Sequence, residues 1–263
     1  MLSRPEIDRF IETGHLRLEG AIAPDVAAGC AGSAAAQLGF GAGPPWPVPV
    51  IRGLVTGTAV AEAARSPRLI AAVGQLLAGE RWQPLAGLGL FVVRCPSPVD
   101  PGDTGWHVDA GFPGPDTDSL LTWYVDARST GRGLLLLCLL TDVGPDDAPT
   151  RILDGSHRQM PALLAPFGDA GVVGLQAPLP DPVGPVSLAT GQAGDVYLCH
   201  PFLVHAAGWP HRGDRPRVLA QPPVAIDGGL RLDAPSGERS PVSTAVVSGG
   251  RGRSPGSGGR SAR

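Results

Sequence analysis

The hydrophobic pattern of the chain changes near residue 86. Before that point apolar side chains recur at helical spacing, as Ile7, Phe10 and Ile11 do after a proline. One short stretch differs, because Leu16 and Leu18 alternate with polar residues as in a half-buried strand. The pattern predicts helices over residues 5–13, about 24–38 and about 59–77.

From residue 86 onward the chain consists of short apolar runs separated by Gly, Pro and Asp. Runs of this length between turn residues are typical of an all-β barrel or double-sheet jelly roll, and not of alternating strand–helix units. We therefore expect a mainly β (α+β) core with the N-terminal helices packed outside it, interrupted by a helical or loop insertion over residues 161–171. The expected strands lie in AGLGLFVVR, SLLTWYV, GLLLLCLLTDV, GDVYLCHPFLVHA and RPRVLAQPPVAI.

Length and composition favour one domain with a tail. The chain has 263 residues, of which 43% are hydrophobic, enough to bury a sizeable core. We place the domain at residues 1–240 and a disordered Gly/Ser/Arg-rich tail at 241–263, because SGGRGRSPGSGGRSAR has almost no apolar content to offset the entropy of ordering. The charged N-terminus and the shortness of every apolar run predict a cytoplasmic protein. The oligomeric state stays open between a monomer and a homodimer.

Charge and residue usage exclude several classes of function. A formal net charge of −3 predicts no nucleic-acid partner and no membrane anchor. All 21 basic residues are arginine, which excludes Schiff-base lysine chemistry and a phosphate-binding Walker lysine. The four cysteines are far apart among apolar neighbours, so we expect buried thiols and no zinc-finger site.

The first candidate chemistry lies in GWHVDAGF, where His107 and Asp109 are two residues apart. On an extended backbone both side chains project to the same face, as a chelating pair requires. The strand GDVYLCHPFLVHA carries two further histidines, His200 and His205. One neutral imidazole from it would complete a site of two histidines and one carboxylate, which leaves positions open on iron(II) for a cosubstrate and dioxygen. His205 is preferred, because Pro201 interrupts the ladder next to His200.

An arginine on the next predicted strand suits a carboxylate cosubstrate. Arg217 follows His205 by twelve residues, and its planar guanidinium could bind the distal carboxylate of 2-oxoglutarate with two hydrogen bonds. Arg215 has the same strand parity and is the second candidate.

Four segments together resemble the phytanoyl-CoA dioxygenase family of non-haem iron(II)/2-oxoglutarate oxygenases, and are similar to actinobacterial members associated with secondary metabolism. The segments are DRFIETGHLRLEGAIAP, GWHVDAGF, LTDVGPDDAPTRILDGSH and GDVYLCHPFLVHAAGWPHRGDRPR. The resemblance spans roughly residues 5 to 240 in matching order.

This resemblance implies a double-stranded β-helix (cupin-like jelly roll) core that binds Fe(II), 2-oxoglutarate and O2. It implies that His107, Asp109 and His205 are the iron ligands and that Arg217 anchors 2-oxoglutarate. The expected reaction is hydroxylation of a small-molecule metabolite or natural-product intermediate, with release of succinate and CO2. Because halogenating relatives lack the carboxylate of Asp109, hydroxylation, desaturation or cyclisation is expected in place of halogenation.

The sequence departs from the family pattern beside the distal histidine. His211 stands where an asparagine is common, and the spacing to Arg217 is one residue longer than usual. Two other functions remain open: a non-catalytic cupin-like small-molecule-binding barrel, and a zinc hydrolase that uses the same ligands.

Other polar and aromatic residues have weaker claims. We expect His200 to be structural and His15 to be exposed, and His157 to be either supporting structure or a wall of the substrate pocket. Arg94 is expected to lie exposed at a strand end, with a position facing the pocket as the alternative. Four aromatic residues near the motif could line the active-site mouth or belong to the core, namely Trp106, Phe112, Trp123 and Tyr124.

Overall fold

A computed structural model describes residues 1–263 except 42, 47, 115–121 and 248–263. The α-helices are α1 Arg4–Thr13, α2 Pro24–Leu38, α3 Thr58–Ala64, α4 Pro67–Leu76, α5 Met160–Leu164 and α6 Pro241–Val247. The strands are β1 His15–Leu18, β2 Val50–Leu54, β3 Leu90–Arg94, β4 Tyr124–Val125, β5 Leu134–Leu139, β6 Arg151–Leu153, β7 Val172–Val173, β8 Val186–Leu188, β9 Val196–Cys199, β10 His205–Ala206, β11 Arg217–Gln221 and β12 Pro223–Val224.

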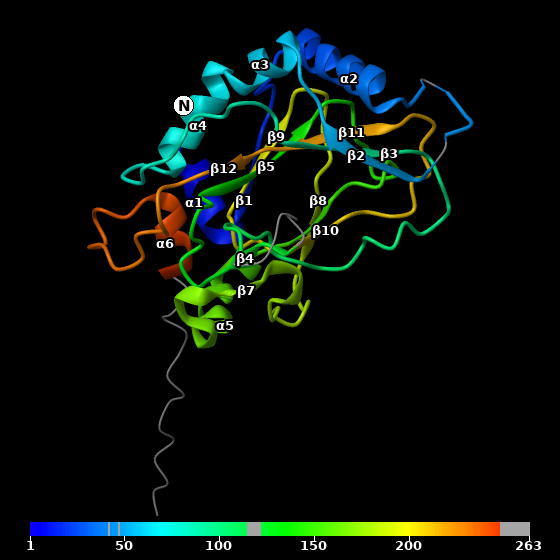
Figure 1. Cartoon of the computed structure of the whole chain (residues 1–263). Helices are drawn as coiled ribbons and strands as arrows, with labels where there is room; N and C mark the ends of the chain where they lie inside the picture. The colour runs from blue at the N-terminus through cyan, green and yellow to red at the C-terminus, as the bar shows by residue number, and fades with distance from the viewer. Residues whose placement is uncertain (42, 47, 115–121, 248–263) are drawn as a thin grey trace, which may run out of the picture.

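The strands form antiparallel sheets. The largest described sheet has seven strands in the order β1-β9-β5-β11-β3-β2, with β12 also paired to β5. A smaller sheet has the order β10-β6-β8, and β4 pairs with β7. Figure 1 shows α2, α3 and α4 grouped together along one side of the strands. The protein is therefore a mixed α/β structure built around antiparallel pairing.

The sequence of β5 is a continuous apolar run because both faces of this strand are buried. Leu134 and Leu136 belong to a core cluster that also includes residues of α2, α3 and α4. Leu135 and Leu137 belong to a second cluster that includes Ile152 of β6 in the smaller sheet. Successive side chains of a strand point to opposite faces, so the two faces of β5 contribute to different core clusters.

The N-terminal helices follow the predictions, with one break. Helices α1 and α2 lie where they were expected, and α2 spans Pro24–Leu38. The single helix expected near residues 59–77 is two helices, because Pro67 starts α4 and Ser66 caps it by accepting a hydrogen bond from the Leu69 amide. The insertion expected over 161–171 is confirmed as α5 and a 3-10 helix at Ala165–Ala170.

The tail prediction needs a correction at its start. Residues 241–247, which the prediction placed in the disordered tail, form α6. Val242 and Val246 bury their side chains in the main core, which accounts for the order of this segment. The remaining predicted tail, 248–263, lies outside the described residues, as do residues 119–121 of the predicted strand SLLTWYV.

Two predictions about single residue types have different outcomes. All four cysteines are buried free thiols, as expected. The expectation that His15 is exposed is wrong: its exposed fraction is 5%, and its Nε2 lies 2.9 Å from the Asp154 carboxylate. The alternation predicted β1 as a strand, but not its pairing with β9, in which His15 lies opposite Cys199. Among the helices that the structure describes, none is long and apolar enough to cross a membrane.

His157 and His200 form a buried histidine pair outside the large sheet. Their rings lie 4.9 Å apart between centroids, and both side chains are fully buried. His157 Nε2 lies 3.3 Å from the Ile11 carbonyl oxygen of α1, and His200 Nε2 lies 3.1 Å from the Val242 carbonyl oxygen of α6. These contacts connect α1 and α6 to the end of β9. They agree with the structural role predicted for these histidines.

Acid is expected to destabilise the protein through this pair. Burial, and next the charge of Arg158, lower the pKa of His157 from 6.5 to about 3. Its stabilising effect is therefore complete above pH 6.5 and is lost as the pH falls towards 3, because only the unfolded chain takes up the proton. Each pH unit in that window costs about 1.4 kcal/mol of unfolding free energy. Urea unfolding at pH 7 and pH 5 measures this loss, which should be smaller in His157→Gln; an equal loss in both proteins contradicts the assignment.

Candidate metal centre

The two segments that carry the site are joined by backbone pairing. His107 and His205 form an isolated antiparallel bridge, in which each amide donates to the other's carbonyl oxygen at 3.0 Å. His205 starts β10, whereas His107 and Asp109 lie in the irregular segment that follows β3. This bridge brings residues 98 positions apart in the chain into one site.

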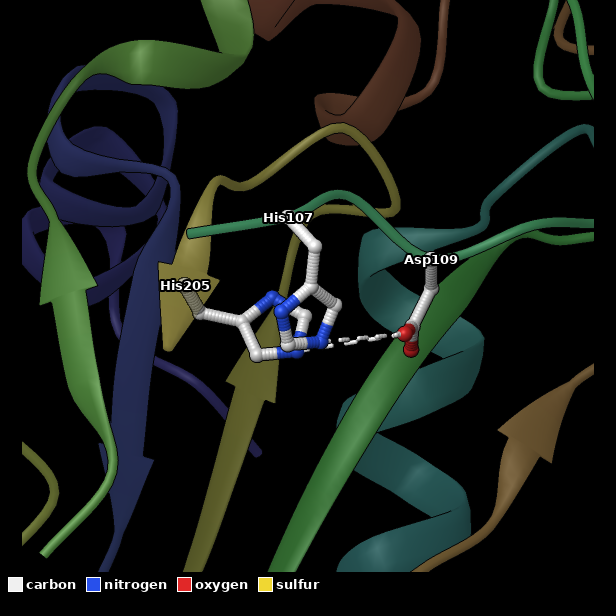
Figure 2. A group of neighbouring side chains, drawn as sticks. All are labelled: His107, Asp109 and His205. Carbon is white, nitrogen blue, oxygen red and sulfur yellow. Dashed lines mark ion pairs between the residues drawn. The ribbon is translucent and has the colours of Figure 1, made fainter. Parts of the chain in front are cut away.

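The side chains of His107, Asp109 and His205 converge (Figure 2). The Oδ1 atom of Asp109 lies 4.0 Å from His107 Nε2 and 3.9 Å from His205 Nε2. One ligand atom from each of the three residues lies within 4.8 Å of the other two. These separations are too long for hydrogen bonds. They suit a cation between the three atoms, since metal bonds to such ligands are about 2.0 to 2.2 Å long.

Backbone carbonyls orient both imidazoles in the same way. His107 Nδ1 lies 3.0 Å from the carbonyl oxygen of Gly105, and His205 Nδ1 lies 3.0 Å from that of Leu203. A carbonyl can only accept, so each Nδ1 carries the proton and each Nε2 keeps its lone pair. Fixing the tautomer by a bond to the other ring nitrogen is typical of histidines that bind metals.

The charges at the site also suit a divalent cation. Burial, and next the neighbouring His107, lower the pKa of His205 to about 4, so this imidazole is neutral near pH 7. Burial opposes ionisation of Asp109, but the charge of Arg132 and the two imidazoles outweigh it and hold the pKa of the carboxyl below its usual value. Two imidazoles and one carboxylate therefore face each other, which is the ligand set of non-haem iron(II) sites.

Arg132 is a polar partner of this site that sequence reasoning missed. Its Nη1 donates to Asp109 Oδ2 at 3.0 Å, and its Nε donates to the Ala110 carbonyl oxygen at 2.8 Å. Arg132 lies 23 residues from Asp109 in a turn with no recognisable motif, so no local signal could have identified it.

Arg217 lies on the face of β11 that points towards the smaller sheet. It shares this face with Leu219, a member of the second core cluster, which also contains Leu135, Leu137 and Ile152. Arg217 is 3% exposed, and its Nη1 donates to the Ala148 carbonyl oxygen at 2.7 Å. Its Nε has no hydrogen-bond partner among the described residues. Arg215, the second candidate, is a surface residue with an 85% exposed side chain.

Arg94 lies directly opposite Arg217 in the register of β3 and β11. The prediction that Arg94 is exposed is wrong, because it is 3% exposed and its Nη2 donates to Asp103 at 2.7 Å. Burial, and next the charge of Arg94, lower the pKa of Arg217 to about 9. The charges of Asp103 and Asp147 act in the opposite direction and raise this pKa.

Residues around the metal ligands have mainly supporting roles. Trp106 lies under the guanidinium of Arg151, which is 4.9 Å from the ring centroid. Arg151 also donates to the carbonyl oxygens of Thr104 and Ala207, so it connects the segment before His107 with the segment after His205. Phe112 packs against Tyr124, with ring centroids 6.1 Å apart. His211 is buried, forms isolated bridges with Ser97 and Asp147, and accepts a hydrogen bond of 3.1 Å from the Ser97 amide at its carbonyl oxygen.

Comparison with known proteins identifies the family. Residues 55–218 match the family model of phytanoyl-CoA dioxygenase (PhyH). This match covers more than half of the chain, and the protein belongs to the PhyH family. A search of curated proteins found no significant match to this chain.

Solved structures share the fold at low sequence identity. The epimerase SnoN, crystallised with Fe3+, alpha-ketoglutarate and nogalamycin RO, is 20% identical with a TM-score of 0.58, over 85% of this chain and 82% of SnoN. HygX from Streptomyces hygroscopicus, with nickel and 2-oxoglutarate bound, is 18% identical with a TM-score of 0.53, over 86% and 87%. The carbocyclase SnoK from nogalamycin biosynthesis is 21% identical with a TM-score of 0.51, over 86% and 84%.

Proposed function

We propose that this protein is an Fe(II)- and 2-oxoglutarate-dependent oxygenase that oxidises a small molecule. The observation that carries the proposal is the convergence of two Nε2 atoms and one carboxylate oxygen, with both Nδ1 atoms already occupied by backbone carbonyls. Membership of the PhyH family supports it independently.

His107, Asp109 and His205 would hold the metal in this proposal. The two imidazoles donate lone pairs from Nε2, and the carboxylate of Asp109 offsets part of the metal's charge. Iron(II) bound there supplies the redox chemistry that couples decarboxylation of 2-oxoglutarate to oxidation of the substrate by dioxygen. The protein orients the ligands, and burial keeps the imidazole of His205 neutral near pH 7.

Arg217 is proposed to bind the distal carboxylate of 2-oxoglutarate. Its support is the buried guanidinium, whose Nε has no hydrogen-bond partner in the described part of the chain, and the parity that directs it towards the smaller sheet. A carboxylate placed there would stabilise a cation whose burial is otherwise unfavourable. Asp103 pairs with Arg94 and Arg52. Of the two arginines that lie opposite each other on β3 and β11, Arg217 is therefore the one proposed to bind the cosubstrate.

We infer that the two larger sheets form a double-stranded β-helix with the N-terminal helices outside it, and that the catalytic domain extends through α6 to residue 247. The two core clusters on opposite faces of β5 support this arrangement. The proposed domain is therefore slightly longer than the range 1–240 expected from the sequence.

A small natural-product intermediate is the proposed substrate. SnoN was crystallised with nogalamycin RO, SnoK belongs to nogalamycin biosynthesis, and one HygX structure contains hygromycin B. Because these proteins include an epimerase and a carbocyclase, we propose oxidation at a C–H bond as the shared step. Hydroxylation is the specific outcome that we expect for this chain.

Anaerobic addition of Fe(II) and 2-oxoglutarate tests this function. We expect a weak visible charge-transfer band that needs both additions, followed on exposure to oxygen by slow formation of succinate without substrate. A zinc hydrolase or a non-catalytic barrel would give neither signal. Absence of both the band and succinate in the folded wild-type protein would contradict the proposal.

A further inference from the structure

We propose that Arg132 restricts Asp109 to metal binding through a single oxygen and so preserves an open coordination position. This inference rests on the proposed function, because it concerns the same metal centre. Arg132 is a positioning residue here: it contacts the ligand carboxylate and acts on the metal through it.

The two oxygens of Asp109 have different surroundings. Oδ1 faces the imidazoles of His107 and His205, at 4.0 and 3.9 Å from their Nε2 atoms. Oδ2 accepts a charged hydrogen bond of 3.0 Å from Arg132 Nη1. Such bonds are among the strongest in proteins, so Oδ2 is held away from the cation site.

A second hydrogen bond fixes the plane of the guanidinium. Arg132 Nε donates to the Ala110 carbonyl oxygen at 2.8 Å, one residue beyond Asp109. The rigid fork of arginine can contact the side chain of one residue and the backbone of the next at the same time. A lysine ammonium has the same charge but lacks this planar arrangement.

Glycines allow the two segments to approach closely enough for these bonds. A Cβ atom on Gly111 would collide with the Thr130 carbonyl oxygen, and one on Gly131 would lie 2.5 Å from the Gly111 carbonyl oxygen. Gly131 also has a φ of 80°, in the region that favours glycine. The backbone next to Asp109 therefore packs directly against the turn that carries Arg132.

The turn itself is held by a buried carboxylate. Asp126 accepts hydrogen bonds from the amides of Arg128 and Thr130 and from the Thr130 hydroxyl, at 2.6 to 3.0 Å. Ser129 Oγ donates to the Arg132 carbonyl oxygen at 2.9 Å. Arg132 is thus presented by an ordered turn, and its contact with Asp109 is not that of a loose surface side chain.

The consequence concerns the number of positions available on the metal. A carboxylate with both oxygens free can occupy two positions, whereas Asp109 with Oδ2 engaged occupies one. Two histidines and one carboxylate oxygen leave about three positions of an octahedral ion for cosubstrate and dioxygen. Loss of Arg132 would release Oδ2 to take one of them.

Water-proton relaxation of the Mn(II)-loaded full-length protein, at saturating Mn(II), tests this inference. In Arg132→Met the contribution of metal-bound water should fall by about one third, as one of three positions is lost. The dissociation constant of 2-oxoglutarate for the Mn(II) protein should rise about tenfold. Unchanged or increased relaxation in Arg132→Met would overturn the inference, because Asp109 would then keep its single-oxygen contact or leave the metal.

Two further variants make the test specific. Arg132→Lys keeps the charge and should also show the decrease, because an ammonium cannot hold both acceptors in this geometry; wild-type behaviour would mean that charge alone suffices and would overturn the proposal. If Arg132→Met does not fold, Arg132→Lys decides. Arg128→Met removes an exposed arginine from the same turn and should match wild type.

The results also separate this inference from the proposed function. If the wild-type protein binds no Mn(II) and His107→Ala behaves identically, the metal centre itself is disproved and the inference falls with it. If wild type binds Mn(II) and 2-oxoglutarate but the Arg132 variants are indistinguishable from it, only the role of Arg132 is disproved.

Discussion

Replacing His107 with alanine is expected to abolish the visible band formed with Fe(II) and 2-oxoglutarate and to reduce succinate formation at least about 100-fold. The imidazole is one of three ligands, and its Nε2 lies 4.0 Å from Asp109 Oδ1 across the proposed cation site. Without it the cation would keep one imidazole and one carboxylate oxygen. Anaerobic absorption spectroscopy and succinate measurement record the two losses.

His157→Gln is the matched control for this experiment. It also removes a histidine, but one that lies in the buried pair with His200 and has no place in the metal centre. This control should retain the band, and its effects should be confined to the stability of the protein and the dependence of that stability on pH. If His107→Ala retains a wild-type band, His107 is not a ligand, and the site must be reassigned.

Replacing Arg217 with methionine is expected to weaken 2-oxoglutarate binding about 30- to 100-fold, which corresponds to about 2 to 3 kcal/mol for lost charged hydrogen bonds. Titration of the charge-transfer band with 2-oxoglutarate measures the change. The loss of the bond to the Ala148 carbonyl oxygen is partly offset in the apoprotein, because the substitution also removes a buried charge whose Nε has no partner among the described residues.

Arg215→Met separates the two arginines that the sequence left as candidates. Its side chain is 85% exposed and pairs only loosely with Asp214, at 3.9 Å. We expect wild-type affinity for 2-oxoglutarate in this variant. Weakened binding in Arg215→Met together with normal binding in Arg217→Met would reverse the assignment.

Much of the architecture could be predicted because its signals are local. Helical spacing located α1 and α2, and the short apolar run in GLLLLCLLTDV located β5 as a strand. Errors arose where a local pattern had two structural solutions. The single helix predicted over about 59–77 is divided, because Pro67 begins a separate helix, α4. The apolar residues after 241 form α6, although the prediction placed them in the tail.

Burial of polar side chains was harder to predict. His15 and Arg94 both lie at strand ends, where the sequence alone favours exposure. In the folded chain His15 is covered beside β9 and pairs with Asp154, while Arg94 lies opposite Arg217 and pairs with Asp103. Each of these partners comes from a segment whose position depends on the whole sheet.

The sequence by itself determined the chemistry available to this protein. The spacing of His107 and Asp109, the distant His205 and the complete use of arginine as the basic residue restricted the candidates to a few metal-dependent functions and a small-molecule-binding barrel. Only the tertiary structure decided which groups meet: the backbone bridge that joins His107 to His205, the carbonyls that fix both imidazole tautomers, and the contact of Arg132 with Asp109. The physical reason is that residue types and periodicity are local properties, whereas a metal site needs atoms from distant segments within about 5 Å, and sheet pairing and glycine contacts set those distances.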